Sequence, residues 1–212
     1  MDFIHPLAND YVTQYSNATP AYLKKVYDAT LVTHPHADMQ SSWNQGGFLT
    51  LISQLLQPKY ILELGTFSGF SAMCLAEGLV NDGQLHTLEL REQDAANAQK
   101  NINQSPHKDK IKIHIGDASE ILQHLTAPWD IVFMDADKVN YGKYYQMIFP
   151  FVKSNGLIIV DNVLFHGEVF NETLKGKNAK AIHAFNQMII SDQQADTVML
   201  TVRDGLSLIR KK

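Results

Sequence analysis

Two short segments place carboxylate and amide side chains where they could hold a metal ion. Asp135 follows the apolar run Ile131–Met134, and Asp161 and Asn162 follow the apolar run Leu157–Val160. If these runs are neighbouring parallel strands, their carboxyl ends meet at one edge of a sheet and the polar side chains converge. Two carboxylates and an amide oxygen suit a hard cation such as Mg²⁺, with Mn²⁺ or Ca²⁺ as alternatives, and such an ion keeps water positions open.

Lys138 lies three positions after Asp135 and is the candidate base. A vicinal diol or hydroxy-carbonyl acceptor could displace water from the ion, which would lower the pKa of the acceptor hydroxyl. Lys138, with a pKa depressed by burial and by the metal, could then take the remaining proton. In the simpler interpretation, Asp161 and Asn162 only start a turn and Lys138 is solvated. The presence of both clusters at strand ends favours the metal site.

A glycine turn after the apolar run Tyr60–Leu64 predicts a nucleoside-binding site. Gly65 and Gly69 are four positions apart, and Phe67 stands where a dinucleotide-binding motif has its middle glycine. Glu63 precedes the turn, where it could pair with a cationic amino-acid group but would repel a pyrophosphate. Both features favour S-adenosylmethionine over NAD as the ligand.

Two further acidic residues support the same prediction. Glu89 ends the second apolar run, about 20 residues after the glycine turn, where a carboxylate typically binds ribose hydroxyls. Asp117, in Gly116-Asp117-Ala118, could accept a hydrogen bond from an adenine amino group. The alternative is that Glu89 is a surface carboxylate and that Asp117 caps a helix, which is compatible with ligand binding.

Strand and helix patterns alternate from residue 60 onward, which predicts an α/β protein. Five strands are expected at Tyr60–Leu64, Gln84–Leu88, Ile111–Ile115, Ile131–Met134 and Leu157–Val160, with helices at Ser71–Leu79, Gln93–Ile102, Ala118–Leu125, Tyr141–Val152 and Ala179–Ile190. Thr197–Val202 and Leu206–Arg210 flank Asp204-Gly205, so they form an antiparallel hairpin. The prediction is a three-layer, doubly wound sheet of seven strands, mostly parallel and closed by a C-terminal hairpin.

The residues before 58 have helical patterns and are expected to form a cap within a single domain of residues 1–212, with the core at 58–212. Thr19 and Pro20 are predicted as the N-cap and first residue of one helix, and Phe48–Leu56 as part of another. The segment Val163–Lys177 is long for a connection and is predicted to fold over the acceptor.

Composition limits the function classes. The net charge of −4 and pI of about 6.1 argue against a domain that coats nucleic acid. The single cysteine, Cys74, excludes an internal disulfide and fits a reducing compartment. We find no signal-peptide pattern and no apolar run of membrane-spanning length, so a cytoplasmic protein without membrane association is expected. Most histidines lack metal-ligand spacing and are expected to be core or surface residues; His166 differs in following Asn162 closely.

Three segments together resemble the cation-dependent O-methyltransferases of the catechol and caffeoyl-CoA type, and look closest to the small bacterial members. They are Leu62–Ser71, Met134–Tyr141 and Asp161–Leu164, and the similarity runs from Met39 to Lys212. The resemblance implies a Rossmann-like class I methyltransferase fold, metal ligation by Asp135, Asp161 and Asn162, Lys138 as the base, and a homodimer. The cofactor contacts that it implies are Met39, Glu63, Gly65, Ser71, Glu89, Asp117, Ala118 and Asp135.

The sequence departs from the family pattern in four places. Asn44 stands where bacterial members often have an acid, Gly47 where they have glutamine, and Phe165 where they have tryptophan. Val198 lies near the position of an additional glutamate in mammalian catechol enzymes. These departures concern acceptor contacts and the lid, not the chemistry.

Two acceptor classes are compatible with these residues. The first is a small phenolic or catechol-like oxygen. The second is a 5-hydroxyuridine in transfer RNA, whose neighbouring oxygens could bind the same ion, and a predicted groove of lysines favours it. The groove would contain Lys138, Lys143, Lys153, Lys175, Lys177 and Lys180. A protein that only binds its ligand would lack Lys138 or the metal set, and both are present.

Overall fold

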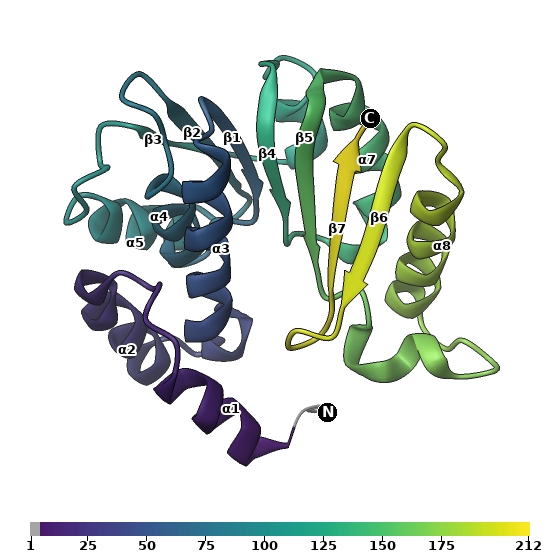
Figure 1. Cartoon of the computed structure of the whole chain (residues 1–212), viewed down its shortest axis with the longest axis horizontal. Coiled ribbons are helices and arrows are strands. Elements are labelled where there is room, and N and C mark those ends of the chain that lie inside the picture. The colour runs from purple at the N-terminus through teal and green to yellow at the C-terminus, as the bar shows by residue number, and fades with distance from the viewer. Residues whose placement is uncertain (1–4) are drawn as a thin grey trace.

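The computed structural model describes residues 5–212 and has a single seven-stranded sheet at its centre (Figure 1). The strand order is β3-β2-β1-β4-β5-β7-β6. The strands are β1 (Tyr60–Leu64), β2 (Gln84–Glu89), β3 (Ile111–Ile115), β4 (Trp129–Met134), β5 (Val152–Asp161), β6 (Ala195–Leu200) and β7 (Leu206–Lys211). The first five are parallel, and β7 is antiparallel to both β5 and β6. The predicted fold class is therefore confirmed.

Helices cover both faces of the sheet, which gives three layers (Figure 1). The helices are α1 (Pro6–Gln14), α2 (Lys24–Thr33), α3 (Trp43–Leu56), α4 (Phe70–Ala76), α5 (Glu92–Ile102), α6 (Ala118–Ile121), α7 (Tyr141–Ile148) and α8 (Lys177–Ser191). Leu49 of α3, Phe70 of α4 and Ala98 of α5 pack on one face, whereas Tyr145 of α7 and Ile182 of α8 pack on the other. The central strands are apolar because both faces are buried.

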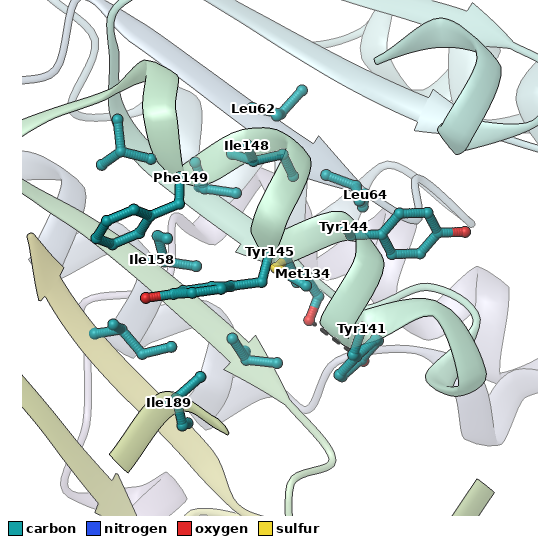
Figure 2. Packing of buried hydrophobic residues seen from close by; sticks show 14 of the residues in the cluster. Leu62, Leu64, Met134, Tyr141, Tyr144, Tyr145, Ile148, Phe149, Ile158 and Ile189 are labelled. Carbon is teal, nitrogen blue, oxygen red and sulfur yellow. Dashed lines mark hydrogen bonds between the residues drawn. The ribbon is translucent and has the colours of Figure 1, made fainter. Parts of the chain in front are cut away.

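Helix α7 fixes the carboxyl ends of the two central strands that carry the predicted metal ligands. Its buried residues Tyr141, Tyr144, Tyr145 and Ile148 recur at helical spacing and face the sheet (Figure 2). The Tyr141 hydroxyl lies 3.4 Å from the carbonyl oxygen of Met134 on β4 and 3.2 Å from that of Asp161 on β5. The strand ends beside the predicted metal ligands are thus held by one buried side chain.

The hairpin turn between β6 and β7 lies at the same edge of the sheet. Leu206, the first residue of β7, pairs with Asp161, the last residue of β5. Because β7 runs antiparallel to β5, the turn residues before Leu206 come beside the carboxyl ends of the parallel strands. Residues near the C-terminus therefore reach the candidate site.

Three local predictions are wrong. The predicted helix Ala118–Leu125 is the short helix α6, which ends at Ile121. Thr19 does not cap a helix; it is buried, and its hydroxyl donates to the carbonyl oxygen of Trp43, while Pro20 precedes the short 3₁₀ helix Ala21–Leu23. The predicted helix Tyr141–Val152 ends at Ile148, and a 3₁₀ turn containing Pro150 follows, because proline cannot continue a helical hydrogen-bond pattern.

The N-terminal helices share a core with the sheet. Leu23 and Val26 are buried in the same apolar cluster as Leu49, Phe70 and Ile61 of β1. The division into a cap of residues 1–57 and a core of 58–212 stays a prediction. Within the described part of the chain, no helix has the length and apolar character needed to cross a membrane.

Candidate active site

A cavity of about 590 Å³ lies at the carboxyl edge of the parallel strands. Its volume falls in the range of small-molecule sites, and its place is where open α/β sheets bind their ligands. The walls contain most of the predicted site residues: Met39, Gly65, Ser71, Glu89, Asp117, Ala118, Asp135, Lys138, Asp161 and Asn162. The structure brings these residues together, and their individual roles stay predictions.

Glu63 is the predicted site residue that lies outside this wall. It is fully buried, and its two carboxyl oxygens accept hydrogen bonds from Ser71 Oγ at 2.6 Å and Thr87 Oγ1 at 2.5 Å. Burial raises the pKa of Glu63 to about 8 despite these two hydrogen bonds. In this arrangement Glu63 orients Ser71, which does line the cavity.

Gly65 allows the two parts of the site to approach each other. Its φ of 99° belongs to the region that favours glycine, and an added Cβ would lie 2.1 Å from the carbonyl oxygen of Asp135. Gly65 N donates to Leu88 O, and Asp135 N donates to Leu64 O. The glycine turn and the first predicted metal ligand are therefore in direct backbone contact.

Glu89 is fixed by backbone groups on either side of it. Its Oε2 accepts from Phe67 N in the glycine turn at 2.8 Å, and its Oε1 accepts from Arg91 N at 3.0 Å. The side chain is 6% exposed and lines the cavity. A carboxylate held in this way can bind a vicinal diol without losing further rotational freedom.

Asp117 caps helix α6, in agreement with the alternative interpretation. Its Oδ1 accepts from Ser119 N at 2.7 Å and from Glu120 N at 3.3 Å. The same residue and the following Ala118 line the cavity. Capping and ligand contact are thus compatible here.

Asp161 is buried at the end of β5 and is held by a residue from an N-terminal helix. Its Oδ2 accepts from Gln45 Nε2 at 2.8 Å, and its Oδ1 accepts from Asn162 N at 2.7 Å. Burial and, next, the negative charge of Asp135 raise its pKa to about 6. A cation beside Asp161 would offset both effects, because it favours the ionised carboxylate.

Asn162 and Asp204 connect this strand end to the hairpin turn. Asn162 has a left-handed backbone with φ of 59°, which asparagine tolerates better than most residues. Its Nδ2 lies 3.2 Å from Asp204 Oδ2, which leaves the amide oxygen as its possible metal ligand. Asp204 also accepts from His166 N at 2.6 Å.

The chemistry of this donor set fits a hard divalent ion. Asp135, Asp161 and Asn162 offer only oxygen ligands, all from the wall of one cavity. Within residues 5–212, no group of three or more His, Cys, Asp or Glu side chains is arranged to hold a metal. The proposed site therefore depends on two carboxylates together with the amide of Asn162.

Lys138 differs from the prediction in the direction of its pKa shift. Its Nζ lies 2.6 Å from Asp135 Oδ1 and 5.2 Å from the ring centre of Tyr141. Burial lowers the pKa of Lys138, but the interactions with Tyr141 and Asp135 together outweigh it and raise the pKa above its ordinary value. The expected depression of this pKa is thus wrong for the arrangement that the structure describes, because Asp135 compensates the ammonium charge.

Several residues that build the site are not predicted from the sequence. Gln45 is fully buried and lies 116 positions before its partner Asp161. Arg203 lines the cavity, Asp204 contacts the predicted ligand Asn162, and Tyr141 contacts the backbone of the predicted ligand Asp161. No local motif marks these contacts, since each joins segments that are distant in sequence. In the sequence, the Asp-Gly turn at 204–205 is only a hairpin signal.

Of the four departures from the family pattern, one lies in the cavity. Phe165 lines it, together with His166, in the 3₁₀ segment Phe165–Phe170. An added Cβ at Gly47 would lie 2.9 Å from Thr19 Oγ1, and Asn44 Nδ2 donates to Thr13 Oγ1. Asn44 and Gly47 therefore pack against the N-terminal segment. Val198 is 57% exposed on β6, away from the cavity wall.

The sheet order, the glycine turn and the acidic residues at successive strand ends define a class I, S-adenosylmethionine-dependent methyltransferase. Comparison with known proteins makes this assignment more specific. The family model described as O-methyltransferase matches residues 13–212, so the chain belongs to this family.

The relatives agree with this family. The chain is 37% identical over 174 residues to a catechol O-methyltransferase of Niastella koreensis, with 78% of this chain and 79% of the relative covered. It is 29% identical to a caffeoyl-CoA O-methyltransferase of Eucalyptus gunnii, with 97% and 89% covered. An O-methyltransferase from Bacillus cereus, solved with S-adenosylhomocysteine, superposes with a TM-score of 0.89 at 29% identity and 97% coverage of both chains. The predicted family and enzyme class are confirmed.

Proposed function

We propose that this enzyme transfers a methyl group from S-adenosylmethionine to one oxygen of a catechol-like acceptor, with a divalent metal ion bound between the acceptor and Asp135, Asp161 and Asn162. The observation that carries the proposal is the pair of carboxylates at the ends of β4 and β5, of which Asp161 is buried and Asp135 is half-buried. The pKa of Asp161 is raised to about 6 by burial and by Asp135, which is the electrostatic setting of a cation site.

The cofactor half of the cavity is proposed to hold S-adenosylmethionine. Glu89 would bind the ribose hydroxyls, Asp117 and Ala118 would contact the adenine, and Met39, Gly65, Ser71 and Asp135 would line the remainder, with Glu63 behind Ser71. Glu89 is already oriented by Phe67 N and Arg91 N. Placement of the cofactor against Gly65 would put its methyl group near Asp135, because these residues are in contact.

Mg²⁺, or Mn²⁺ or Ca²⁺ in the same place, would lower the pKa of an acceptor hydroxyl and orient its oxygen. Asp161 would be held for this role by Gln45, and Asn162 by Asp204. Lys138 is the proposed base. Its ammonium must first lose a proton, and the ion pair with Asp135 opposes that loss, so the pH dependence of turnover tests the assignment.

A transfer-RNA acceptor is the second candidate, and the positions of the lysines weaken it. Lys153 pairs with Asp130 near the start of β4, at the opposite end of the strands from the cavity. Lys138 is 17% exposed and paired with Asp135. The six lysines therefore do not form one groove at the active face.

The assay is methyl transfer to 1,2-dihydroxybenzene, with and without chelation by EDTA. We expect turnover that EDTA abolishes and that Mg²⁺ or Mn²⁺ restores. Full activity after exhaustive chelation would contradict the metal site. Analysis of transfer-RNA nucleosides from a deletion strain tests the other acceptor, because a missing methyl group on 5-hydroxyuridine would favour RNA.

A homodimer and a cytoplasmic location remain proposals. Helix α1 exposes the apolar side chains of Leu7, Tyr11, Val12 and Tyr15. Burial of such a surface in a second copy would be favourable. Sedimentation of the full chain measures the assembly state, and fractionation of cells measures the location.

A further inference from the structure

The acceptor end of the cavity contains a cation that the proposed chemistry does not use. Arg203 lines the cavity together with Asp161, Asn162, Phe165 and His166. It lies in the turn between β6 and β7, two positions before Gly205. Arg203 therefore lies at the end of the cavity where the acceptor is proposed to bind, and its guanidinium could bind a group of that acceptor.

The charges of the cavity wall make Arg203 unusual. Six carboxylate residues line the cavity, against three lysine or arginine residues. Arg91 Nε lies 2.6 Å from Asp94 Oδ2, and Lys138 pairs with Asp135. Within residues 5–212, Arg203 has no carboxylate within ion-pair distance.

The one hydrogen bond of the Arg203 side chain leaves most of its donors available. Its Nη2 donates to the carbonyl oxygen of Asp38 at 2.7 Å. A guanidinium carries five N–H donors in a planar arrangement that matches a carboxylate. The bond to Asp38 therefore orients the group without consuming its capacity for a second partner.

The position of Arg203 is fixed relative to the metal set. Asp204, the next residue, bonds to Asn162 Nδ2 and His166 N through its side chain, and its carbonyl oxygen accepts from Leu164 N at 2.9 Å. Gly205 has φ of 85°, and a Cβ there would lie 2.5 Å from Leu164 Cγ. The turn is thus joined to the segment that follows β5, which fixes the backbone next to Arg203 relative to Asn162.

We propose that Arg203 binds a carboxylate on the acceptor, so that the preferred substrates are ortho-dihydroxy aromatic acids rather than neutral catechols. The two hydroxyl oxygens would face Asp161 and Asn162, the ring would lie near Phe165, and the carboxylate would meet the guanidinium. An anionic substrate would otherwise be repelled by the acidic wall. This inference rests on the proposed function and specifies its acceptor.

The test compares 3,4-dihydroxybenzoate and 3,4-dihydroxycinnamate with their methyl esters, which keep the hydroxyls and remove the negative charge. Arg203→Gln retains a donor for the Asp38 carbonyl but loses the charge, and Arg203→Lys retains the charge without the planar group. Arg210→Gln is the matched control, because Arg210 is exposed on β7 and pairs with Asp196. Kinetics are measured with Mg²⁺ present, and acceptor affinity by calorimetry with S-adenosylhomocysteine and Mg²⁺.

The wild type is expected to prefer the acids. Arg203→Gln should weaken their binding and raise their KM roughly 10- to 100-fold, the usual effect of losing a charged hydrogen bond, with little change in kcat or in the esters. For the acids, the KM of Arg203→Lys should lie between the values of the wild type and Arg203→Gln. The KM of Arg210→Gln should resemble that of the wild type. If Arg203 only supports the turn or eases ionisation of Asp161, acids and esters lose affinity equally, which overturns the proposal.

The remaining outcomes separate this inference from the proposed function. Turnover of acids and esters without selectivity contradicts the Arg203 subsite and leaves the methyl transfer intact. Selective, Arg203-dependent binding without turnover keeps the subsite and contradicts the proposed reaction. If neither selective binding nor turnover is found, both the Arg203 subsite and the proposed reaction are contradicted. Faster methylation of a transfer-RNA fragment with 5-hydroxyuridine than of any acid, slowed by Arg203→Gln, would assign Arg203 to a phosphate and overturn the carboxylate proposal.

Discussion

The two halves of the cavity are positioned by different kinds of contact. In the cofactor half, backbone groups within one turn or one neighbouring strand hold the side chains: Phe67 N and Arg91 N hold Glu89, and Ser119 N holds Asp117. In the acceptor half, Asn162 N also holds Asp161, but side chains distant in sequence add the other contacts: Gln45 contacts Asp161, and Asp204 contacts Asn162. Backbone contacts survive most substitutions, whereas side-chain contacts do not.

The two halves of the cavity should therefore respond differently to substitution. A change in the acceptor half should alter metal affinity or turnover and leave cofactor binding intact. A change in the cofactor half should weaken cofactor binding and leave metal affinity intact. Substitutions that affect both measurements equally would show that the halves act as one unit.

The largest effect is expected for Lys138→Ala. Loss of a base that acts only in the transition state should lower kcat by about 10²–10⁴-fold while the affinity for S-adenosylmethionine stays nearly unchanged. Lys138→Arg should not restore turnover, because a guanidinium stays protonated at working pH. Steady-state kinetics over a range of pH is the measurement. A Lys138→Ala enzyme with wild-type kcat throughout that range would exclude the catalytic role.

A smaller effect is expected for Gln45→Leu. This change removes the hydrogen bond to Asp161 Oδ2 in a fully buried place. Outer partners of metal ligands typically contribute about 10- to 100-fold to metal affinity, so Mn²⁺ binding should weaken by that range. Gln54→Leu, at an exposed position of the same helix, is the control. Equal Mn²⁺ affinity in Gln45→Leu and wild type, with both proteins folded, would rule out a positioning role for Gln45.

In the cofactor half, Glu89→Ala should weaken binding of S-adenosylmethionine by about tenfold or more, since charged hydrogen bonds contribute about 1.5–3 kcal/mol each. Metal affinity should not change. Calorimetric titration with S-adenosylmethionine and, separately, with Mn²⁺ measures the two affinities. Unchanged cofactor affinity, or tighter binding of NAD, would remove Glu89 from the ribose site.

The last effect concerns stability. The pKa of Glu63 is raised to about 8 by burial, so the folded state keeps a proton that the unfolded chain releases. Its contribution is fully present below the ordinary pKa of 4.5 and is lost as the pH rises towards 8, by at most about 1.4 kcal/mol per pH unit. The contribution of Asp161 to stability likewise falls as the pH rises from the ordinary pKa of 3.8 to the raised pKa of about 6.

Glu63→Gln should remove the Glu63 part of this pH dependence in chemical denaturation. Mg²⁺ should remove the Asp161 part, because a bound cation favours the ionised carboxylate. A Glu63→Gln protein with the same decline in stability between pH 5 and 8 as the wild type would contradict the assignment.

The same contrast explains what the sequence predicts and what it does not. The strands themselves and the acidic residues predicted to bind the cofactor follow from local signals: apolar runs, a glycine turn and acids near successive strand ends. Gln45 and Arg203 carry no such signal, because their roles depend on contacts across 116 and 165 positions. In the arrangement without a bound ion, the Lys138 pKa is raised rather than depressed, since Asp135 and Tyr141 outweigh burial; the effect of a bound metal stays a prediction.

The metal site can be tested by calorimetric titration of the wild-type protein and of Asp161→Asn with Mn²⁺, and then with S-adenosylhomocysteine. Asparagine keeps the size of the side chain and an oxygen that can accept from Gln45, but it removes the negative charge. We predict one Mn²⁺ per wild-type chain, loss of that binding in Asp161→Asn, and equal S-adenosylhomocysteine affinity in the two proteins. Equal Mn²⁺ binding in both, or none in the wild type, would contradict the metal site.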